Sequence, residues 1–268
     1  MPDFLAIAVE IARDAGSLLL PYFDRRVRVE YKGDVDLVTE ADRASERLIV
    51  ERLRARFGDH AIVAEEGGER PGGSAYCWYV DPLDGTTNFA HGFPVWCISI
   101  GLERSGEMIA GVVYDPVRNE LFTAEKGAGA FLNNRAIRVS AIGGLAESLL
   151  ATGFPSHRRH RNPNIHFYHQ MNMRSHGVRR AGAAALDLCY VACGRVDGYW
   201  EFNLNPWDMA AGMVLVKEAG GRVTDVRGGA HWVSSDSILA SNGLVHAELL
   251  QICSEIFRGA YLAPLPAV

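Results

Sequence analysis

Apolar residues recur every three or four positions between Leu5 and Leu19, with charged residues between them. This spacing is typical of an α-helix with one buried face, and the charges argue against a secretory signal peptide. A strand is predicted at Val27–Lys32, a polar turn at 33–36 and a second, more charged helix from about Glu40 to Phe57. The chain is therefore expected to begin with two helices separated by a strand and a turn.

Short apolar or alternating segments follow, each bounded by turn residues, which is the pattern of β-strands. The predicted strands of this region are His60–Ala64, Tyr76–Val80, Trp96–Glu103, Glu107–Tyr114 and Leu121–Ala124. The last three are expected to form an antiparallel meander, followed by turns at Gly127–Phe131 and Asn133-Asn134.

From about residue 145, predicted strands and helices alternate. The strands are Ser148–Thr152, Gly198–Phe202, Arg222–Thr224 and Ser237–Ala240, and the helices are Ala181–Cys193, Met209–Ala219 and Leu244–Phe257. We therefore predict a mixed α+β and α/β fold. An antiparallel-sheet half, residues 1–144, packs against an α/β half, residues 145–268, in one compact unit.

Composition excludes several other classes of protein. Of the 268 residues 48% are hydrophobic and 22% charged, which excludes a disordered or fibrous chain. The net charge of -5 offers no basic surface for DNA or an anionic membrane, and no apolar stretch reaches the roughly 18 residues of a membrane span. The five cysteines contain no CxxC pair, which favours free thiols in a reducing compartment. We expect a cytoplasmic protein.

Acidic residues gather where predicted strands end and helices begin. They are Glu65, Glu66, Asp81, Asp84 and Asp208. Taken singly, Asp84 and Asp208 are equally well explained as helix N-caps, and the two glutamates as solvated turn residues. Taken together, they lie where α/β folds usually place functional groups.

If these strand ends converge, several carboxylates share a small volume and need a cation to remain ionised. The ligands would all be oxygen atoms, which favours Mg²⁺ or Mn²⁺ over Zn²⁺. The adjacent Gly85-Thr86-Thr87 supplies backbone N–H groups for an anion at a predicted helix start. This combination predicts a metal-assisted phosphatase.

The same residues closely resemble the inositol monophosphatase family, part of a superfamily of lithium-sensitive, magnesium-dependent phosphatases. The most specific elements are Asp81-Pro82-Leu83-Asp84-Gly85-Thr86 and Trp207-Asp208. The resemblance covers nearly the whole chain, through segments 35–39, 64–66, 81–89, 180–188, 198–201 and 206–212. It implies a layered αβαβα sugar-phosphatase fold and hydrolysis of inositol monophosphate.

The resemblance also implies residue roles. Glu65, Asp81 and the Leu83 carbonyl would hold one Mg²⁺. Asp81, Asp84 and Asp208 would hold a second, and Glu65 would help to hold a weaker third. Glu65, Thr86 and Asp36 would be catalytic, since Thr86 and Asp36 orient the attacking water. The Gly85 and Thr86 amides would bind phosphate.

For substrate selection, the resemblance implies that Gly182, Ala183, Ala184 and Glu201 bind polyol hydroxyls, beside Asp84 and Asp208. Many relatives carry Ser or Thr where this chain has Ala183, so the sequence leaves other sugar phosphates open. Fructose-1,6-bisphosphatase or dual activity is the alternative within catalysis. A regulatory, RNA-related binding protein of the same fold is the alternative outside it. The family also implies a homodimer.

A stretch rich in histidine and arginine, residues 156–177, is not explained by the resemblance. It contains His157, His160, His166, His169 and His176. Spacing and composition favour a solvated loop or an oligomer contact over a transition-metal site.

Overall fold

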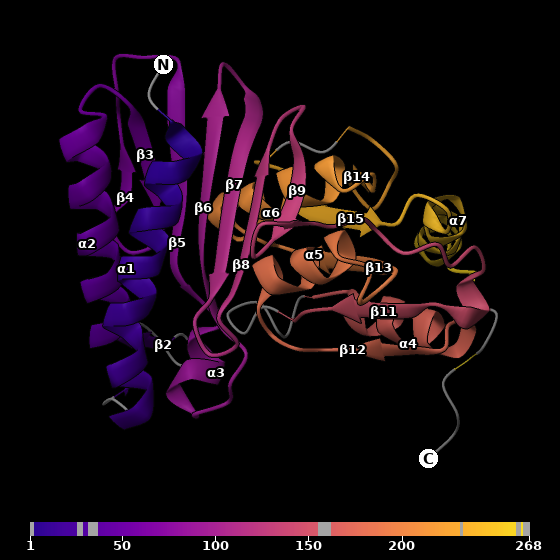
Figure 1. Ribbon diagram of the computed structural model, residues 1–268. Helices are drawn as coiled ribbons and strands as arrows, with labels where there is room; N and C mark the ends of the chain where they lie inside the picture. Colours follow the sequence, from indigo (N-terminus) through magenta and orange to yellow (C-terminus); the bar gives the residue numbers. More distant parts are fainter. Residues whose placement is uncertain are drawn as a thin grey trace.

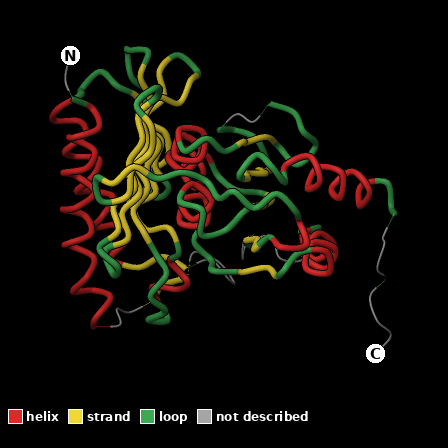
Figure 2. The backbone as a smooth tube through the Cα atoms, turned by 45° about the vertical axis from the view of Figure 1, so that its right-hand side comes forward, coloured by secondary structure: helices red, strands yellow, loops and turns green. Residues whose placement is uncertain are grey.

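The computed structural model describes residues 3–25, 29–31, 37–154, 162–230, 233–260 and residue 264. Helices and sheets alternate in five layers, visible edge-on in Figure 1 and again after rotation in Figure 2. The helices are α1 (Phe4–Arg25), α2 (Glu40–Arg56), α3 (Thr86–Ala90), α4 (Asn164–Arg174), α5 (Ala184–Ala192), α6 (Pro206–Glu218) and α7 (His246–Phe257), with a 3-10 turn η1 (Leu145–Glu147). The predicted αβαβα layering is confirmed.

The first sheet has eight strands in the order β10-β9-β8-β7-β6-β5-β3-β4. All neighbours are antiparallel except β3 and β5, which run parallel. The strands are β3 (Ala61–Ala64), β4 (Gly68–Arg70), β5 (Tyr76–Asp84), β6 (Cys97–Arg104), β7 (Glu107–Asp115), β8 (Glu120–Glu125), β9 (Gly129–Leu132) and β10 (Arg135–Ala136). The predicted meander is confirmed as β6, β7 and β8.

The second sheet has five strands in the order β12-β11-β13-β15-β14. Strand β11 pairs in parallel with both β12 and β13, whereas the β13-β15 and β15-β14 pairs are antiparallel. The strands are β11 (Leu149–Thr152), β12 (Gly177–Arg179), β13 (Gly198–Phe202), β14 (Arg222–Thr224) and β15 (Ser237–Ser241), and a separate two-stranded pair joins β1 (Val29–Tyr31) to β2 (Leu37–Thr39).

Helices α1 and α2 cover one face of the large sheet (Figure 1). The apolar face predicted for α1 is buried, with Ala8, Ala12, Ala15 and Leu19 between 0 and 2% exposed. No helix in the described part of the chain is long and apolar enough to cross a membrane.

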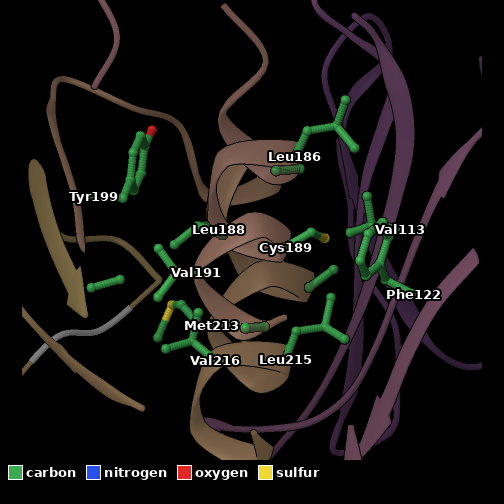
Figure 3. Close-up of a cluster of buried hydrophobic side chains, with 14 of the residues drawn as sticks. Val113, Phe122, Leu186, Leu188, Cys189, Val191, Tyr199, Met213, Leu215 and Val216 are labelled. Carbon is green, nitrogen blue, oxygen red and sulfur yellow. The ribbon is translucent and has the colours of Figure 1, made fainter. Parts of the chain in front are cut away.

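Helices α5 and α6 fill the layer between the two sheets. Figure 3 shows Leu186 and Cys189 pointing toward Val113 and Phe122 of the large sheet, while Val191 points to the opposite side. The contact between α6 and the large sheet is close because Gly111 lacks a side chain: a Cβ there would lie 2.5 Å from the Ala211 carbonyl oxygen. This packing places the start of α6 beside the end of β5 and the start of β6.

Several predicted elements need correction. The turn expected at Gly127–Phe131 contains most of strand β9, whose residues 129–132 pair with β8 and extend the meander. Helix α5 begins at Ala184 and not Ala181, because Gly182 has a φ of 88° and Ala183 is extended. The strand predicted at Val27–Lys32 is confirmed only over Val29–Tyr31, since its other residues and the turn at 33–36 lie outside the described residues.

Candidate active site

Of the five acidic residues that the sequence places at strand ends and helix starts, Glu65, Asp81, Asp84 and Asp208 line one pocket, and Glu66 does not. Asp81 and Asp84 lie near the end of β5, where the register with β6 shifts between them. Glu65 follows β3, the parallel neighbour of β5, and Asp208 lies in the first turn of α6. The lining residues are Glu65, Asp81, Leu83, Asp84, Gly85, Thr86, Thr87, Gly153, Phe154, Arg180, Gly182, Ala183, Ala184, Glu201, Leu204, Asn205 and Asp208. Among the residues predicted to form the site, only Asp36 cannot be placed, because it lies outside the described residues.

Asp81 is the most deeply buried carboxylate of the group, at 2% exposed, and it accepts a hydrogen bond of 3.0 Å from the Leu83 N–H. Burial raises its pKa well above the ordinary value, and the charges of Glu65, Asp84 and Asp208 raise it further. Burial also raises the pKa of Asp84 and of Asp208. These groups form an assembly of negative charge that a cation would stabilise.

The donor atoms fit a hard divalent cation. Four carboxylates and the Leu83 carbonyl are oxygen donors, the preferred ligands of Mg²⁺ and Mn²⁺. Within the part of the chain that the structure describes, no three His, Cys, Asp or Glu side chains are already grouped as a complete ligand set.

Asp84 caps a helix, but not the one expected from the sequence. The residue before α3 is Gly85, in a left-handed conformation with φ 92°. The Asp84 carboxylate instead accepts hydrogen bonds from the N–H groups of Ala184 (3.2 Å) and Ala185 (2.8 Å), at the start of α5. The buried Cys97 thiol lies 3.6 Å from the same carboxylate and donates to it. One side chain of the first half therefore fixes a helix of the second.

Asp208 is not the N-cap of α6, contrary to the helix-cap explanation that the sequence left open. Helix α6 begins two residues earlier, at Pro206, and Asn205 is its N-cap. Asp208 is the third helical residue, and its carboxylate accepts a hydrogen bond of 2.7 Å from the Asn205 N–H. This capping box fixes Asp208 at the pocket wall.

The Thr86 hydroxyl oxygen lies 3.1 Å from two acceptors, Asp42 Oδ1 and the Leu83 carbonyl oxygen. Asp42 is 1% exposed, in the first turn of α2. The resemblance pairs Thr86 with Asp36, which lies outside the described residues, so that pairing stays a prediction. Asp42 is a contact of Thr86 that the sequence did not predict.

A signal for Asp42 was present in the sequence. Asp42 and Glu46 are spaced by one helical turn on the face of α2 that also carries Ile49 and Leu53, and all four are buried. A charged residue on a buried helix face needs a partner, so its position indicates a contact with another element.

Glu46 holds the turn that carries Glu65. Its carboxylate accepts a hydrogen bond of 2.6 Å from the Glu66 N–H, and burial raises its pKa. A Cβ on Gly67 would lie 2.6 Å from Glu46 Oε1, so a side chain there would displace the Glu46 carboxylate. In this arrangement Glu66 contributes a backbone N–H to the support of the turn.

Glu201 lies on β13, lines the same pocket and is 5% exposed. Tyr199 donates a hydrogen bond of 2.5 Å to its Oε2. Burial raises the pKa of Glu201 to about 8, so the carboxyl group is mostly protonated at neutral pH. Gly153 packs directly against the Glu201 carboxyl group, since a Cβ at residue 153 would lie 2.0 Å from Glu201 Oε2.

Two further residues near Glu201 were not predicted from the sequence. Arg180 lines the pocket. Asp187 lies outside the lining and is 1% exposed, and among the described residues its Oδ2 has no hydrogen-bond partner. Burial raises the pKa of Asp187, and the charge of Glu201 raises it further.

The histidine- and arginine-rich stretch is partly helical, so the expectation of a solvated loop is wrong for residues 164–174. Asn164, at the start of α4, is fully buried. Its side chain donates to Thr152 Oγ1 (2.8 Å) and the Gly153 carbonyl (2.7 Å), and it accepts from Trp200 Nε1 (2.5 Å). These bonds join the end of β11 to β13 beside the pocket. His157 and His160 lie outside the described residues.

Comparison with known proteins identifies similar chains over nearly the full length. The model of the inositol monophosphatase family matches residues 1–257. An inositol-1-monophosphatase of Synechocystis is 47% identical over 94% of this chain and 88% of its own length. A protein of Pseudomonas aeruginosa named Nus factor SuhB is also 47% identical, over 90% of this chain and 92% of its own length.

Among solved structures, the inositol monophosphatase from Anabaena (Nostoc) sp. superposes with a TM-score of 0.86. It is 44% identical to this chain, and the match covers 94% of this chain and 95% of that one. The sequence relatives therefore carry two names at equal identity, while the structural match agrees with the five-layered fold.

Proposed function

Because this chain belongs to the inositol monophosphatase family, we propose that it is a Mg²⁺-dependent phosphatase that hydrolyses inositol monophosphate to inositol and phosphate. One observation carries the proposal: Glu65, Asp81, Asp84 and Asp208 line the same pocket as Glu201 and the start of α5. We propose that the first group binds metal and phosphate and that the second binds the polyol.

At the phosphate end, Glu65, Asp81 and the Leu83 carbonyl would hold one Mg²⁺, and Asp81, Asp84 and Asp208 a second, with Mn²⁺ as a substitute. Glu65 would also help to hold a weaker third ion. When bound, Mg²⁺ supplies Lewis acidity that neutralises charge on the phosphoryl group and lowers the pKa of water. Gly85 and Thr86 would offer backbone N–H groups to the phosphate.

Thr86, together with Asp36, would direct the attacking water. Donation of its hydroxyl hydrogen to Asp42 leaves oxygen lone pairs that accept a hydrogen bond from water. A water held in this way is aligned for in-line attack on phosphorus. No Ser or Cys occurs among the described residues that line the pocket, so we propose direct displacement, which inverts a chiral phosphate, without a phosphoenzyme.

At the polyol end, the backbone of residues 182–184 and the Glu201 carboxyl group would bind substrate hydroxyls. Tyr199 fixes one oxygen of Glu201, so the group presents a defined geometry to the ligand. Ala183 provides no hydroxyl of its own.

Phosphate release tests the proposal on inositol 1-phosphate, fructose 1,6-bisphosphate, histidinol phosphate and 3′-phosphoadenosine 5′-phosphate, with Mg²⁺ and with EDTA. We expect the highest kcat/KM for inositol 1-phosphate and loss of turnover in EDTA. Turnover that is unaffected by EDTA, or absent on every substrate, would refute the proposal.

Two observations favour second candidates. Arg180 on the pocket wall suits a substrate with a second phosphate, such as fructose 1,6-bisphosphate. The name Nus factor SuhB of one relative favours a regulatory binding role. The complete acidic set supports catalysis, because a protein without turnover would not need four carboxylates in one pocket.

A further inference from the structure

Asn88, in α3 directly after the pocket residues Thr86 and Thr87, is bonded to the segment that contains the pocket residues 180, 182, 183 and 184. Its side-chain Nδ2 donates to the carbonyl oxygens of Val95 (2.8 Å) and Ala181 (2.9 Å), with the Gly182 carbonyl oxygen at 3.3 Å. The residue is 8% exposed and is not part of the pocket lining. A residue of the first half is thus bonded to backbone that lies 93 positions later in the chain.

Asp84 holds the next part of the same segment. Its carboxylate accepts from the N–H groups of Ala184 and Ala185, while Asn88 donates to the carbonyls of Ala181 and Gly182. Two side chains only four positions apart therefore bind both kinds of backbone polar group in residues 181–185, which we name the selector segment.

The contact leaves little space. Gly182 has a φ of 88°, and a Cβ there would lie 3.2 Å from Asn88 Nδ2 and 2.9 Å from Arg180 Nη1. A displaced segment would leave backbone carbonyls without their donor in a buried place, which is unfavourable. The bond lengths and this close approach restrict the selector segment to one position.

We propose that Asn88 is a positioning residue that sets substrate selectivity by holding the selector segment at a fixed place relative to the metal and phosphate end. The effect on selectivity depends on the proposed phosphatase function, whereas the effect on the segment does not. Asn88 acts through the segment and does not touch substrate.

The substitution Asn88→Asp tests this with little change in volume. It replaces the two N–H donors by a carboxylate oxygen, which repels the carbonyls of Ala181 and Gly182. The segment should move away, and the polyol should lose its partners, while Glu65, Asp81 and Asp208 at the phosphate end stay in place. Asn88→Ala is the milder second variant, because it removes the donors without adding repulsion.

A matched control exists in Asn242. It is 4% exposed, and its Nδ2 donates to Ser140 Oγ (2.9 Å) and the Ile142 carbonyl (2.8 Å), away from the pocket lining. Asn242→Asp imposes the same chemical change on a buried asparagine, so it reports the cost to stability alone.

Two measurements test whether Asn88 holds the selector segment in place. In the protein without substrate, hydrogen–deuterium exchange should accelerate about 10-fold or more at the amides of Ala184 and Ala185 in Asn88→Asp, and not in Asn242→Asp. In steady-state assays, the ratio of kcat/KM for inositol 1-phosphate to that for p-nitrophenyl phosphate should fall about 10-fold in both Asn88 variants.

The outcomes separate the two proposals. Unchanged exchange in the selector segment of Asn88→Asp would overturn the positioning role, and so would an equal loss on both substrates. If wild-type protein hydrolyses neither substrate, the phosphatase proposal and the selectivity claim both fail, while the exchange data still decide whether Asn88 holds the segment.

Discussion

The two parts of the pocket that we propose to bind phosphate and polyol are built in opposite ways. The proposed phosphate end takes its groups mainly from one stretch of chain, since Asp81 and Asp84 end β5 and Thr86 begins α3. The proposed polyol end combines the backbone of the selector segment with Glu201 of the second sheet. At the first end several buried charges repel one another, whereas at the second a buried carboxyl group is hydrogen-bonded by Tyr199.

We expect this difference to separate chemistry from selection. If the proposed phosphate end depends on charge, removal of one charge should change turnover and metal binding. The polyol end depends on the placement of neutral or protonated groups, so its variants should change selectivity more than turnover. The predictions below test this contrast.

The largest effect is expected for Asp81→Asn. Loss of the most buried carboxylate should lower turnover at least about 100-fold. The metal-free variant should unfold at the same temperature as wild type or higher, because mutual repulsion is relieved. Differential scanning fluorimetry should show Mg²⁺ stabilising wild type but not the variant.

Asp197→Asn is the control for that experiment. Asp197 is a buried aspartate outside the pocket lining that accepts a hydrogen bond of 2.7 Å from the Leu149 N–H. This variant should lose stability but keep its response to Mg²⁺. A normal Mg²⁺ response in Asp81→Asn would contradict the assignment of Asp81 as a metal ligand.

The next effect is expected for Asp42→Asn. The amide no longer provides a charged acceptor for the Thr86 hydroxyl, so kcat should fall about 10- to 100-fold with a small change in KM. Because the two residues act as one unit, Thr86→Val should add little to Asp42→Asn in the double variant. Fully additive losses in kcat would show that they act separately.

A smaller effect is expected for Glu201→Leu. It should reduce kcat/KM for inositol 1-phosphate about 10-fold and leave p-nitrophenyl phosphate nearly unchanged. Glu201→Gln should retain more activity, since Glu201 with a pKa of about 8 is mostly protonated at neutral pH. Equal losses on both substrates would place Glu201 at the phosphate end.

The smallest effect concerns His246, which braces the sheet that carries Glu201. Its ring nitrogens lie 3.0 Å from Thr224 Oγ1 on β14 and 2.9 Å from Ser241 Oγ on β15. Burial lowers its pKa to about 4, so the unfolded chain, with a pKa near 6.5, binds the proton first as pH falls. Stability contributed by the neutral ring is complete above about pH 6.5 and is lost toward pH 4.

Urea unfolding at two pH values measures this. Between pH 7 and pH 5, the free energy of unfolding should fall by roughly 1 to 2 kcal/mol more in wild type than in His246→Gln. Equal pH dependence of the unfolding free energy in the two proteins would show that His246 does not titrate in this way.

Local pattern was enough to predict much of the fold. Helical periodicity located α1 and α2, and alternation located the meander of β6, β7 and β8, because these patterns follow from which face each element buries. The apolar pattern did not predict where α5 and α6 begin. The start of α5 depends on the conformation of Gly182, and the start of α6 on the capping box at Asn205. Neither feature affects the spacing of apolar residues.

The sequence by itself also determined the acidic composition of the pocket. Asp81, Asp84 and Thr86 are near neighbours, and their positions at a strand end follow from local structure. Only the tertiary structure showed Asp42 beside Thr86 and Asp84 at the start of α5. These contacts join residues 44 and 101 positions apart. A hydrogen bond requires its two atoms within about 3.5 Å, and packing of the layers, not spacing along the chain, brings such atoms together.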